Sequence, residues 1–317
     1  YHKDEGIRYL PVNVLKALNR PLLSGIGLYN ERFLATPERY GLYRNLLDVT
    51  DSLPIGITTT NDEFVSMAGI NCATCHTAMI TYQGRVFFVD GASSQFAIDR
   101  FIKEMIFASL FTLLSPYEFD AFYARYEKET KISSEIDKKY NETIDSLEYA
   151  ELVENKQLYK SLDNKELKLF LNSLNAKLQL NEKFELAYPT DKQLNTKYKM
   201  FVYMTKRVKF FLDQADFAAN PEGSTVADSG LGRSNPWGVT KNLLAQVIYK
   251  QPKSNWLKNP GGPINTPFIW NYDRLKWIFV SGVTNSMVQR NLAQGIALVT
   301  DFDHDTYETV VSLRKLE

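Results

Sequence analysis

The stretch NCATCH at residues 71–76 is the most informative part of this chain, and the predictions for the rest of the chain start from it. It contains a Cys-x-x-Cys-His motif, in which Cys72 and Cys75 are separated by two residues and His76 follows at once. This is the spacing that attaches a c-type haem. On one helical turn, both sulfurs can reach the two vinyl groups at one porphyrin edge, and the next residue directs its imidazole at the iron. The motif therefore predicts one haem c bound through Cys72 and Cys75, with His76 as the proximal iron ligand. Asn71, directly before this turn, is its expected N-cap.

Two other uses of the cysteines compete with haem attachment. The chain has two cysteines, and both lie in this motif. A zinc site usually takes four Cys or His ligands, so it would also need His2, His304 or a distant carboxylate. A thioredoxin-like redox motif is expected to open a helix after a strand in a βαβ unit, and residues 63–70 do not have the pattern of a parallel strand. Haem attachment is therefore favoured over zinc binding and dithiol chemistry.

Length, composition and charge bound the class of protein. With 317 residues the chain can form one large domain or two ordinary ones, and its 44% hydrophobic content is typical of a soluble globular protein. The 37 basic and 37 acidic residues cancel, so the overall charge gives no support to nucleic-acid binding. The longest apolar run, residues 105–114, is shorter than the about 20 residues of a membrane-spanning helix. It predicts a buried helix, and no transmembrane segment is expected.

The motif also predicts where the protein works. The chain opens at Tyr1 without an initiator Met or the hydrophobic region of a signal peptide, which is typical of a processed or trimmed chain. Covalent haem attachment takes place outside the cytoplasm in bacteria, so we expect a periplasmic or extracellular protein. Residues 311–317 still have helical character without a cap, and the chain is expected to end within an element.

Hydrophobic spacing predicts a mainly α-helical protein: a loop-rich, cytochrome c-like haem domain with a small β-hairpin and a charged helical insertion. Residues 1–60 are expected to contain short helices joined by loops. The hairpin is expected where residues 80–82 and 85–89 flank Gln83-Gly84. Helices are expected at residues 11–18, 38–47, 98–106, from 116 to 126, 191–216 and 287–299.

Composition divides the chain into three regions. Residues 1–124 are predicted to be the haem c-binding region. Residues 125–186 are rich in Lys and Glu and contain no Gly, which predicts a charged helical insertion, either a solvated hairpin or a docking arm for a partner protein. Residues 187–317 are the predicted remainder of the haem domain, in which residues 217–270 are irregular because turn signals recur at short intervals.

Several segments resemble a known family. Residues 54–56 (PIG) ahead of 69–77 (GINCATCHT), then Asp90-Gly91 and a Phe-rich helix, are similar to the first haem region of RoxA-like rubber oxygenases. These are relatives of the bacterial di-haem cytochrome c peroxidases. The resemblance implies a mainly helical cytochrome c fold with His76 as the proximal ligand and a second Cys-x-x-Cys-His domain after the first. Similarity extends to residues 232–238 (GRSNPWG), 267–271 (PFIWN) and 290–292 (RNL).

The second haem domain is where this chain departs from the family. It contains one Cys-x-x-Cys-His motif, so it is expected to be either a fragment cut before the second domain or a one-haem relative that lost it. The redox partner is accordingly expected to be a second haem domain, another subunit or a separate protein.

The sixth ligand of the iron would decide the reaction, because a strong ligand gives an electron carrier and an open position allows oxygen or peroxide chemistry. In the resembled oxygenases an aromatic residue covers the open face, and the similarity at residues 232–238 implies Trp237 near that place, or else a loop aromatic packed on the core. Arg233 could serve a haem propionate, a bound ligand or a loop salt bridge. Other candidates for the sixth ligand are His2, His304, Met67, Met79, Met105, Met200, Met204 and Met287.

Together these patterns predict an exported c-type cytochrome that acts in electron transfer or in haem-based oxidation related to the di-haem peroxidases. The alternative is a pure electron-transfer or multimer-forming cytochrome without catalytic activity. In that alternative the Lys/Glu-rich residues 125–186 would dock redox partners, or haems would line up between subunits.

Overall fold

The computed structural model describes residues 7–24, 27–46, 53–60, 65–130 and 194–218, with short pieces at 230–234, 264–271 and 274–277 and a few single residues. This part of the chain contains, besides its helices, nine short strands that pair into four antiparallel sheets. The expectation of a mainly α, cytochrome c-like fold with one small hairpin is therefore wrong. Several strands are buried on both faces or exposed on both, so the alternation of polar and apolar residues that marks a strand is missing from the sequence.

A three-stranded sheet leads into the motif. β1 (Leu10–Pro11) and β4 (Ile57–Thr59) flank β5 (Met67–Ile70), and both pairings are antiparallel. All four residues of β5 are buried. The backbone of Tyr9 extends the pairing by donating a hydrogen bond to the carbonyl oxygen of Ala68 at 2.8 Å. β5 therefore carries the chain to residue 71 from a buried, fully paired position.

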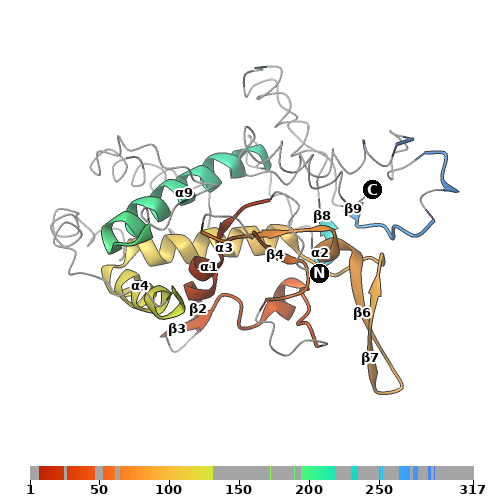
Figure 1. Ribbon diagram of the computed structural model, residues 1–317, viewed down its shortest axis with the longest axis horizontal. Helices are drawn as coiled ribbons and strands as arrows, with labels where there is room; N and C mark the ends of the chain where they lie inside the picture. Colours follow the sequence, from red (N-terminus) through yellow and green to blue (C-terminus); the bar gives the residue numbers. More distant parts are fainter. Residues whose placement is uncertain are drawn as a thin grey trace.

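The other strands form two-stranded sheets. The pairs are β2 (Asn19–Ser24) with β3 (Gly27–Arg32), β6 (Thr77–Tyr82) with β7 (Arg85–Asp90), and β8 (Arg233–Ser234) with β9 (Ile264–Asn265). The β6–β7 hairpin confirms the sequence prediction, and its turn residues Gln83 and Gly84 have φ values of 49° and 75°. Positive φ at both positions is typical of a type I′ turn, whose twist matches that of the strands. Figure 1 shows this hairpin projecting away from the long helices.

The three long helices are α3 (Ile98–Leu114), α4 (Pro116–Thr130) and α9 (Lys197–Ala218), and α3 contacts both α4 and α9, away from the β6–β7 hairpin (Figure 1). The shorter helical segments are α1 (Val12–Ala17), the 3-10 helix η1 (Pro37–Tyr40) and α2 (Cys72–His76). α4 begins at Pro116 because proline is favoured in the first turn, where its missing N–H leaves no hydrogen bond unmade. In α3, every residue from 108 to 114 is buried, which confirms the predicted buried helix.

Pairs of aromatic side chains join these helices to one another and to neighbouring segments. Phe119 of α4 meets Phe201 of α9 edge to face, with ring centroids 5.0 Å apart. Near the beginning of α3, the ring of Phe101 lies 5.3 Å from Phe33 and 5.4 Å from Tyr40. Such ring pairs contribute about 0.5–1.5 kcal/mol each beyond the area they bury. The core therefore depends on the shape of a few large rings.

Arg207 attaches α9 to the residues before β1. Its side chain is fully buried, and its Nε donates a hydrogen bond to the carbonyl oxygen of Tyr9 at 2.6 Å. A second guanidinium nitrogen donates to the carbonyl oxygen of Arg8, and the group lies 4.9 Å from the ring centroid of Phe211. Carbonyl oxygens and an aromatic face offset the cost of burying the charge. The first strand and the last described helix are thereby held together.

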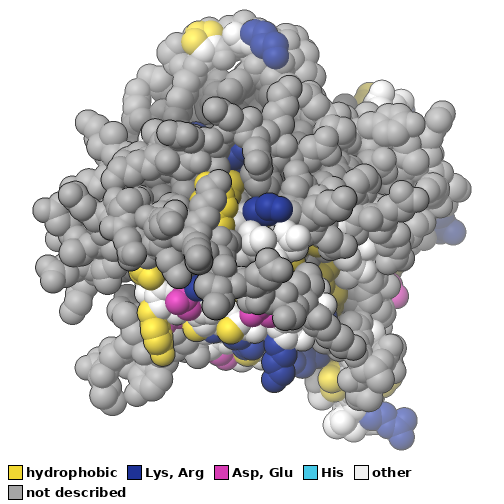
Figure 2. Space-filling model, turned by 60° about the vertical axis from the view of Figure 1, so that its left-hand side comes forward, with side chains coloured by type: hydrophobic (Ala, Val, Ile, Leu, Met, Phe, Trp, Pro, Cys, Tyr) yellow, Lys and Arg dark blue, Asp and Glu magenta, His cyan; other side chains and the backbone are white. Residues whose placement is uncertain are grey.

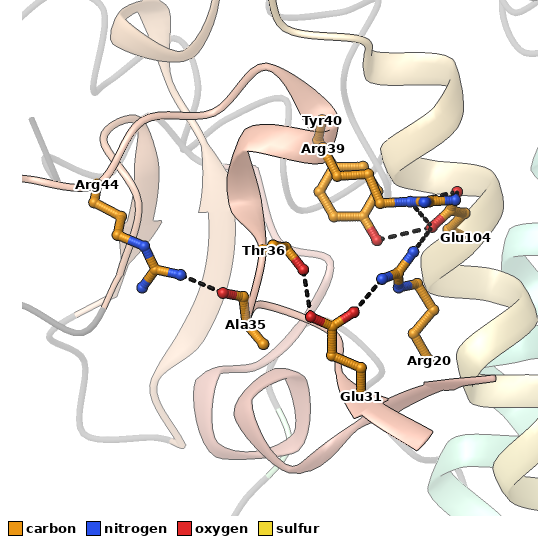
Figure 3. Close-up of polar contacts among 8 residues, drawn as sticks. All are labelled: Arg20, Glu31, Ala35, Thr36, Arg39, Tyr40, Arg44 and Glu104. Atoms are coloured by element: carbon orange, nitrogen blue, oxygen red, sulfur yellow. Dashed lines mark hydrogen bonds and ion pairs between the residues drawn. The ribbon is translucent and has the colours of Figure 1, made fainter. Parts of the chain in front are cut away.

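A cluster of charged side chains fastens η1 and β2 to α3 (Figure 3). Glu104 of α3 accepts hydrogen bonds from Arg39 at 2.6 Å and from the hydroxyl of Tyr40 at 3.0 Å. The same carboxylate lies 3.6 Å from a guanidinium nitrogen of Arg20, whose side chain is 7% exposed. Burial is the main reason that the pKa of the Tyr40 phenol is raised, so Tyr40 acts as a donor throughout the ordinary pH range.

Glu31 of β3 extends this cluster. It forms an ion pair with Arg20 and accepts a hydrogen bond from the hydroxyl of Thr36 at 2.5 Å (Figure 3). The hydrogen bond from Thr36 is the largest cause that holds the pKa of the Glu31 carboxyl below its usual range. The β2–β3 hairpin, the loop after it and α3 are thus connected by charged groups as well as by apolar packing.

Helices are the part of the fold for which most sequence predictions are confirmed. Those expected at residues 11–18, 98–106, 116–126 and 191–216 correspond to α1, α3, α4 and α9. The helix expected at residues 38–47 is wrong beyond Tyr40, since Gly41 takes a φ of 71° and Arg44 pairs with Pro54 in an isolated bridge. Residues 19–24 pair with residues 27–32 as antiparallel strands where short helices and loops were expected.

Other predictions fall mostly on residues that the structure does not describe. The boundary predicted at residue 125 lies within α4, and nearly all of residues 131–186 are outside the described ranges. The helix expected at 287–299 and the chain after it are also outside them, apart from residue 289. Within residues 217–270 the described pieces add one short pair of strands, β8 and β9, to the expected irregular chain.

The described surface agrees with the balanced charge of the sequence. On the face seen in Figure 2, basic, acidic and apolar side chains of the described residues lie in close succession. Among the helices that the structure describes, none combines the length and the apolar character needed to cross a membrane. This agrees with the expectation of no transmembrane segment for that part of the chain.

Candidate functional site

The Cys-x-x-Cys-His motif is the single short helix α2, and its first turn is capped by its own residues. The side-chain oxygen of Asn71 accepts a hydrogen bond from the backbone N–H of Ala73 at 3.0 Å. In return, the hydroxyl of Thr74 accepts one from the N–H of Asn71 at 3.3 Å. This reciprocal capping box satisfies N–H groups that a helix start otherwise leaves without a partner. Asn71 is therefore the N-cap that its position predicts.

The loop before β4 anchors this helix at close range. The hydroxyl of Thr74 donates to the carbonyl oxygen of Gly56 at 2.7 Å, and the N–H of Asn71 donates to the same oxygen at 3.0 Å. Gly56 has a φ of 87°, and a Cβ on it would lie 2.4 Å from the backbone nitrogen of Thr74. Only glycine can adopt this positive φ and also let the backbone of Thr74 approach so closely without displacing the helix.

The two thiols and the imidazole fit the donor set of a haem c site. Cys72 and Cys75 are half-buried, form no disulfide, and lie three residues apart, which places them on one side of the helical turn. His76 ends the same helix and is 6% exposed. Thiols that solvent can reach in part, beside an imidazole on the next residue, are the groups that two thioether bonds and one axial ligand would use. Cys72, Cys75 and His76 therefore remain the candidate haem ligands.

The base of the β6–β7 hairpin returns to the motif. The N–H of Ser94 donates to the carbonyl oxygen of Cys75 at 2.9 Å, and the N–H of Gly91 donates to that of His76 at 2.7 Å. One residue further, the hydroxyl of Thr77 donates to the carboxylate of Asp90 at 3.3 Å. The last carbonyl groups of α2 are thus satisfied by the chain that follows the hairpin, which holds the end of the motif in place.

A distant segment contacts the same base. Trp270 donates its Nε1–H to the carbonyl oxygen of Asp90 at 2.8 Å, and the N–H of Ile269 donates to that of Gly91 at 2.8 Å. Sequence reasoning missed this role of Gly91 and Trp270. An Asp-Gly pair after a strand is a turn signal that could have identified Gly91, but no local pattern relates it to a residue about 180 positions away.

Arg233 is exposed and belongs to β8. Its Nε donates to the side-chain oxygen of Asn265 at 3.0 Å, so the described contact of Arg233 is an interaction across the β8–β9 pair. Trp237, His2 and His304 are outside the described residues.

Four of the six methionines considered as sixth ligands have fully buried side chains. Met79 is different, because it lies on β6 and is 38% exposed. Met287 is outside the described residues. Within the ranges that the structure describes, no three His, Cys, Asp or Glu side chains gather closely enough to hold a metal ion. The four buried methionines are Met67, Met105, Met200 and Met204.

The strand before the motif bears on the dithiol alternative. β5 ends at Ile70, directly before the N-cap, so a strand does lead into the Cys-x-x-Cys helix, as in thioredoxin-like sites. However, β5 is antiparallel to both neighbours, and α2 is followed by the antiparallel β6–β7 hairpin. The local order of strand and helix is present, whereas the described residues around it do not form a βαβ unit.

The similarity found to a known protein covers part of the chain. No protein-family profile matches this chain, and no solved structure matches it. An uncharacterized protein of Sinorhizobium fredii, y4iJ, is 27% identical in an alignment of 143 residues; the match covers 38% of this chain and 23% of that protein. The match therefore spans about a quarter of the length of this relative.

Proposed function

We propose that this chain binds one haem c and acts as an exported c-type cytochrome, in electron transfer or in haem-based oxidation. One observation carries the proposal: the Cys-x-x-Cys-His motif forms a capped helical turn, with two half-buried thiols on one side and an imidazole on the next residue. Export follows from the proposal, because haem c is attached outside the cytoplasm in bacteria.

Each residue of the motif has one role in this proposal. Cys72 and Cys75 would hold the porphyrin through thioether bonds, and His76 would bind the iron from the proximal side. The bound haem would supply one-electron redox chemistry and, where the sixth position is open, a site for oxygen or peroxide. Asn71 and Thr74 support the site by fixing the turn that carries both cysteines and the proximal histidine.

The reaction class depends on the sixth ligand of the iron and on the groups beside it. The resemblance to RoxA-like oxygenases and di-haem peroxidases supports oxidation, with Trp237 near the open face and Arg233 beside the haem or its ligand. It also supports a second haem domain, subunit or separate redox partner. The zero net charge supports a function without nucleic acid. The alternative is a pure electron-transfer or multimer-forming cytochrome without catalysis.

The central experiment is maturation of the chain in the periplasm of a bacterium that attaches haem c. We expect the purified protein to gain the mass of one haem and to keep its haem colour on a denaturing gel. Replacing both cysteines, Cys72→Ala with Cys75→Ala, should abolish covalent haem, whereas Tyr82→Ala at the 63% exposed end of β6 should not. Covalent haem in the double variant would refute the proposed attachment site.

A second measurement separates the two cytochrome classes. A high-spin ferric spectrum and binding of carbon monoxide to the ferrous protein would indicate an open sixth position and favour oxidation. A purely six-coordinate, low-spin spectrum without carbon monoxide or cyanide binding would favour the pure electron carrier.

The position of β5 directly before α2 favours dithiol redox chemistry as a second candidate. In that case the periplasmic chain would carry no haem, and mass spectrometry would find Cys72 and Cys75 cycling between a disulfide and two thiols.

A further inference from the structure

We infer that residues 264–271, named here the clamp, position the backbone of His76 and thereby set the orientation of its imidazole. The inference rests on the proposed haem site. It adds residues that would act on the iron only through His76, so they are positioning residues and not ligands.

Two backbone hydrogen bonds join the clamp to the motif through a single residue, Gly91. The N–H of Ile269 donates to the carbonyl oxygen of Gly91 at 2.8 Å, and the N–H of Gly91 donates to that of His76 at 2.7 Å. Fixing this carbonyl group fixes the Cα and Cβ of His76, from which the imidazole extends. Groups that orient an axial histidine tune the iron although they do not touch it.

Trp270 adds a contact that depends on Gly91 being glycine. Its Nε1–H donates to the carbonyl oxygen of Asp90, and its indole covers the position where a Cβ of Gly91 would lie: such an atom would be 2.5 Å from Nε1 and 2.8 Å from Cδ1. Gly91 also has a φ of 81°, which other L-residues rarely adopt. The indole and the glycine therefore form one close-packed unit next to His76.

Further hydrogen bonds hold the clamp against the chain after β7. The hydroxyl of Ser93 donates to the carbonyl oxygen of Thr266, whose own N–H donates to that of Gly232 at 3.1 Å. The β8–β9 pairing, with its Arg233–Asn265 hydrogen bond, lies at the beginning of the clamp. The clamp is thus attached at several points, and Trp270 with Ile269 forms the part that reaches the motif.

The decisive experiment compares two pairs of variants in the haem-loaded protein. Trp270→Phe removes the indole donor, and Gly91→Ala forces the indole away. Their matched controls are Trp277→Phe, on another exposed tryptophan, and Gly84→Ala, at a positive φ of 75° where a Cβ meets no atom within 4 Å. Electron paramagnetic resonance of the ferric haem and the midpoint potential report the orientation and bonding of the axial imidazole.

We expect Trp270→Phe and Gly91→Ala to shift the resonance g values and the midpoint potential while covalent haem is retained, and both controls to match the parent. A parent-like signal and potential in Trp270→Phe would overturn the inference, even if Gly91→Ala fails to fold.

In the haem-free chain, Trp270→Phe should also speed hydrogen exchange at the amide of Gly91. An unchanged exchange rate would overturn the clamp independently of haem, whereas a parent without covalent haem would refute the proposed function itself.

Discussion

The helical core and the Cys-x-x-Cys-His turn are held in place by different means. In the core, large rings such as Phe101, Phe119 and Phe201 are fully buried and fill the space between helices. Around the turn, backbone groups approach each other directly, and Gly56 and Gly91 make this approach possible. Stability in the core therefore depends on side-chain volume, whereas the position of the turn depends on a few contacts that one added methyl group would break.

The largest expected effect is on the core side of this comparison. Phe101→Ala should lower the free energy of unfolding by about 3–5 kcal/mol, because it removes a ring that contacts Phe33 and Tyr40 and leaves a cavity. Phe101→Leu, which keeps most of the volume, should cost about 1–2 kcal/mol. Urea denaturation measures both. Equal losses in the two variants would show that volume is not what the core depends on.

At the Cys-x-x-Cys-His turn, Gly56→Ala should lower the free energy of unfolding by about 2–3 kcal/mol, because the added Cβ meets the backbone of Thr74 and the helix must shift. It should also reduce the yield of covalent haem in periplasmic maturation. Gly84→Ala is the control, since its positive φ alone should cost about 1 kcal/mol and leave haem attachment unchanged. If Gly56→Ala resembled this control, close approach would not be the property that fixes the turn.

A third prediction concerns the charged cluster around Glu104, which is held neither by side-chain volume, as the core is, nor by close backbone contacts, as the turn is. Arg20→Met should cost about 2 kcal/mol in the free energy of unfolding, because Glu104 and Glu31 lose a nearly buried partner while Arg39 still pairs with Glu104. Arg44→Met, on an ion pair whose side chains are about half exposed, is the matched control and should change stability little. A comparable loss in the control would argue that burial does not strengthen the cluster.

The smallest effect expected is a dependence of stability on pH. The pKa of Glu31 is lowered in the folded protein, chiefly by the hydrogen bond from Thr36, so the unfolded chain binds its proton at higher pH. The contribution of Glu31 is then complete above its unfolded pKa and is lost as the pH falls through the folded pKa. Denaturation at a series of acidic pH values should show this loss, and Thr36→Val should reduce it. An acid slope that Thr36→Val leaves unchanged would assign the loss to other carboxyl groups.

Local patterns predicted the elements whose signal lies within a few residues. The spacing of Ile98, Ile102 and Met105 predicted α3, and Gln83-Gly84 predicted the turn of the β6–β7 hairpin, because helix periodicity and positive φ are local properties. The β2–β3 hairpin was missed, since Pro21 within a strand is a signal against one. In the structure Pro21 pairs with Asn30, and each strand of this hairpin has one strand neighbour among the described residues, so β2 is an edge strand, where proline is tolerated.

The candidate site likewise has features that local sequence predicted and contacts that it could not predict. The spacing of Cys72, Cys75 and His76 identified the proposed ligands, and Asn71 was expected as their N-cap. The contacts of Thr74 with Gly56 and of Gly91 with Trp270 could not be predicted, because they join segments 18 and about 180 residues apart. No periodicity or turn chemistry connects such segments, and their meeting depends on the packing of the whole fold.

By itself, then, the sequence determined the groups proposed to hold a haem, the cap of their helix and the long helices of the core, because each depends on interactions within one or two turns of chain. Only the tertiary structure decided that β5 enters the motif from an antiparallel sheet and that Gly56 and Gly91 allow other segments to hold it. Strand partners and close backbone contacts are long-range, and many sequences with the same local preferences could satisfy them differently.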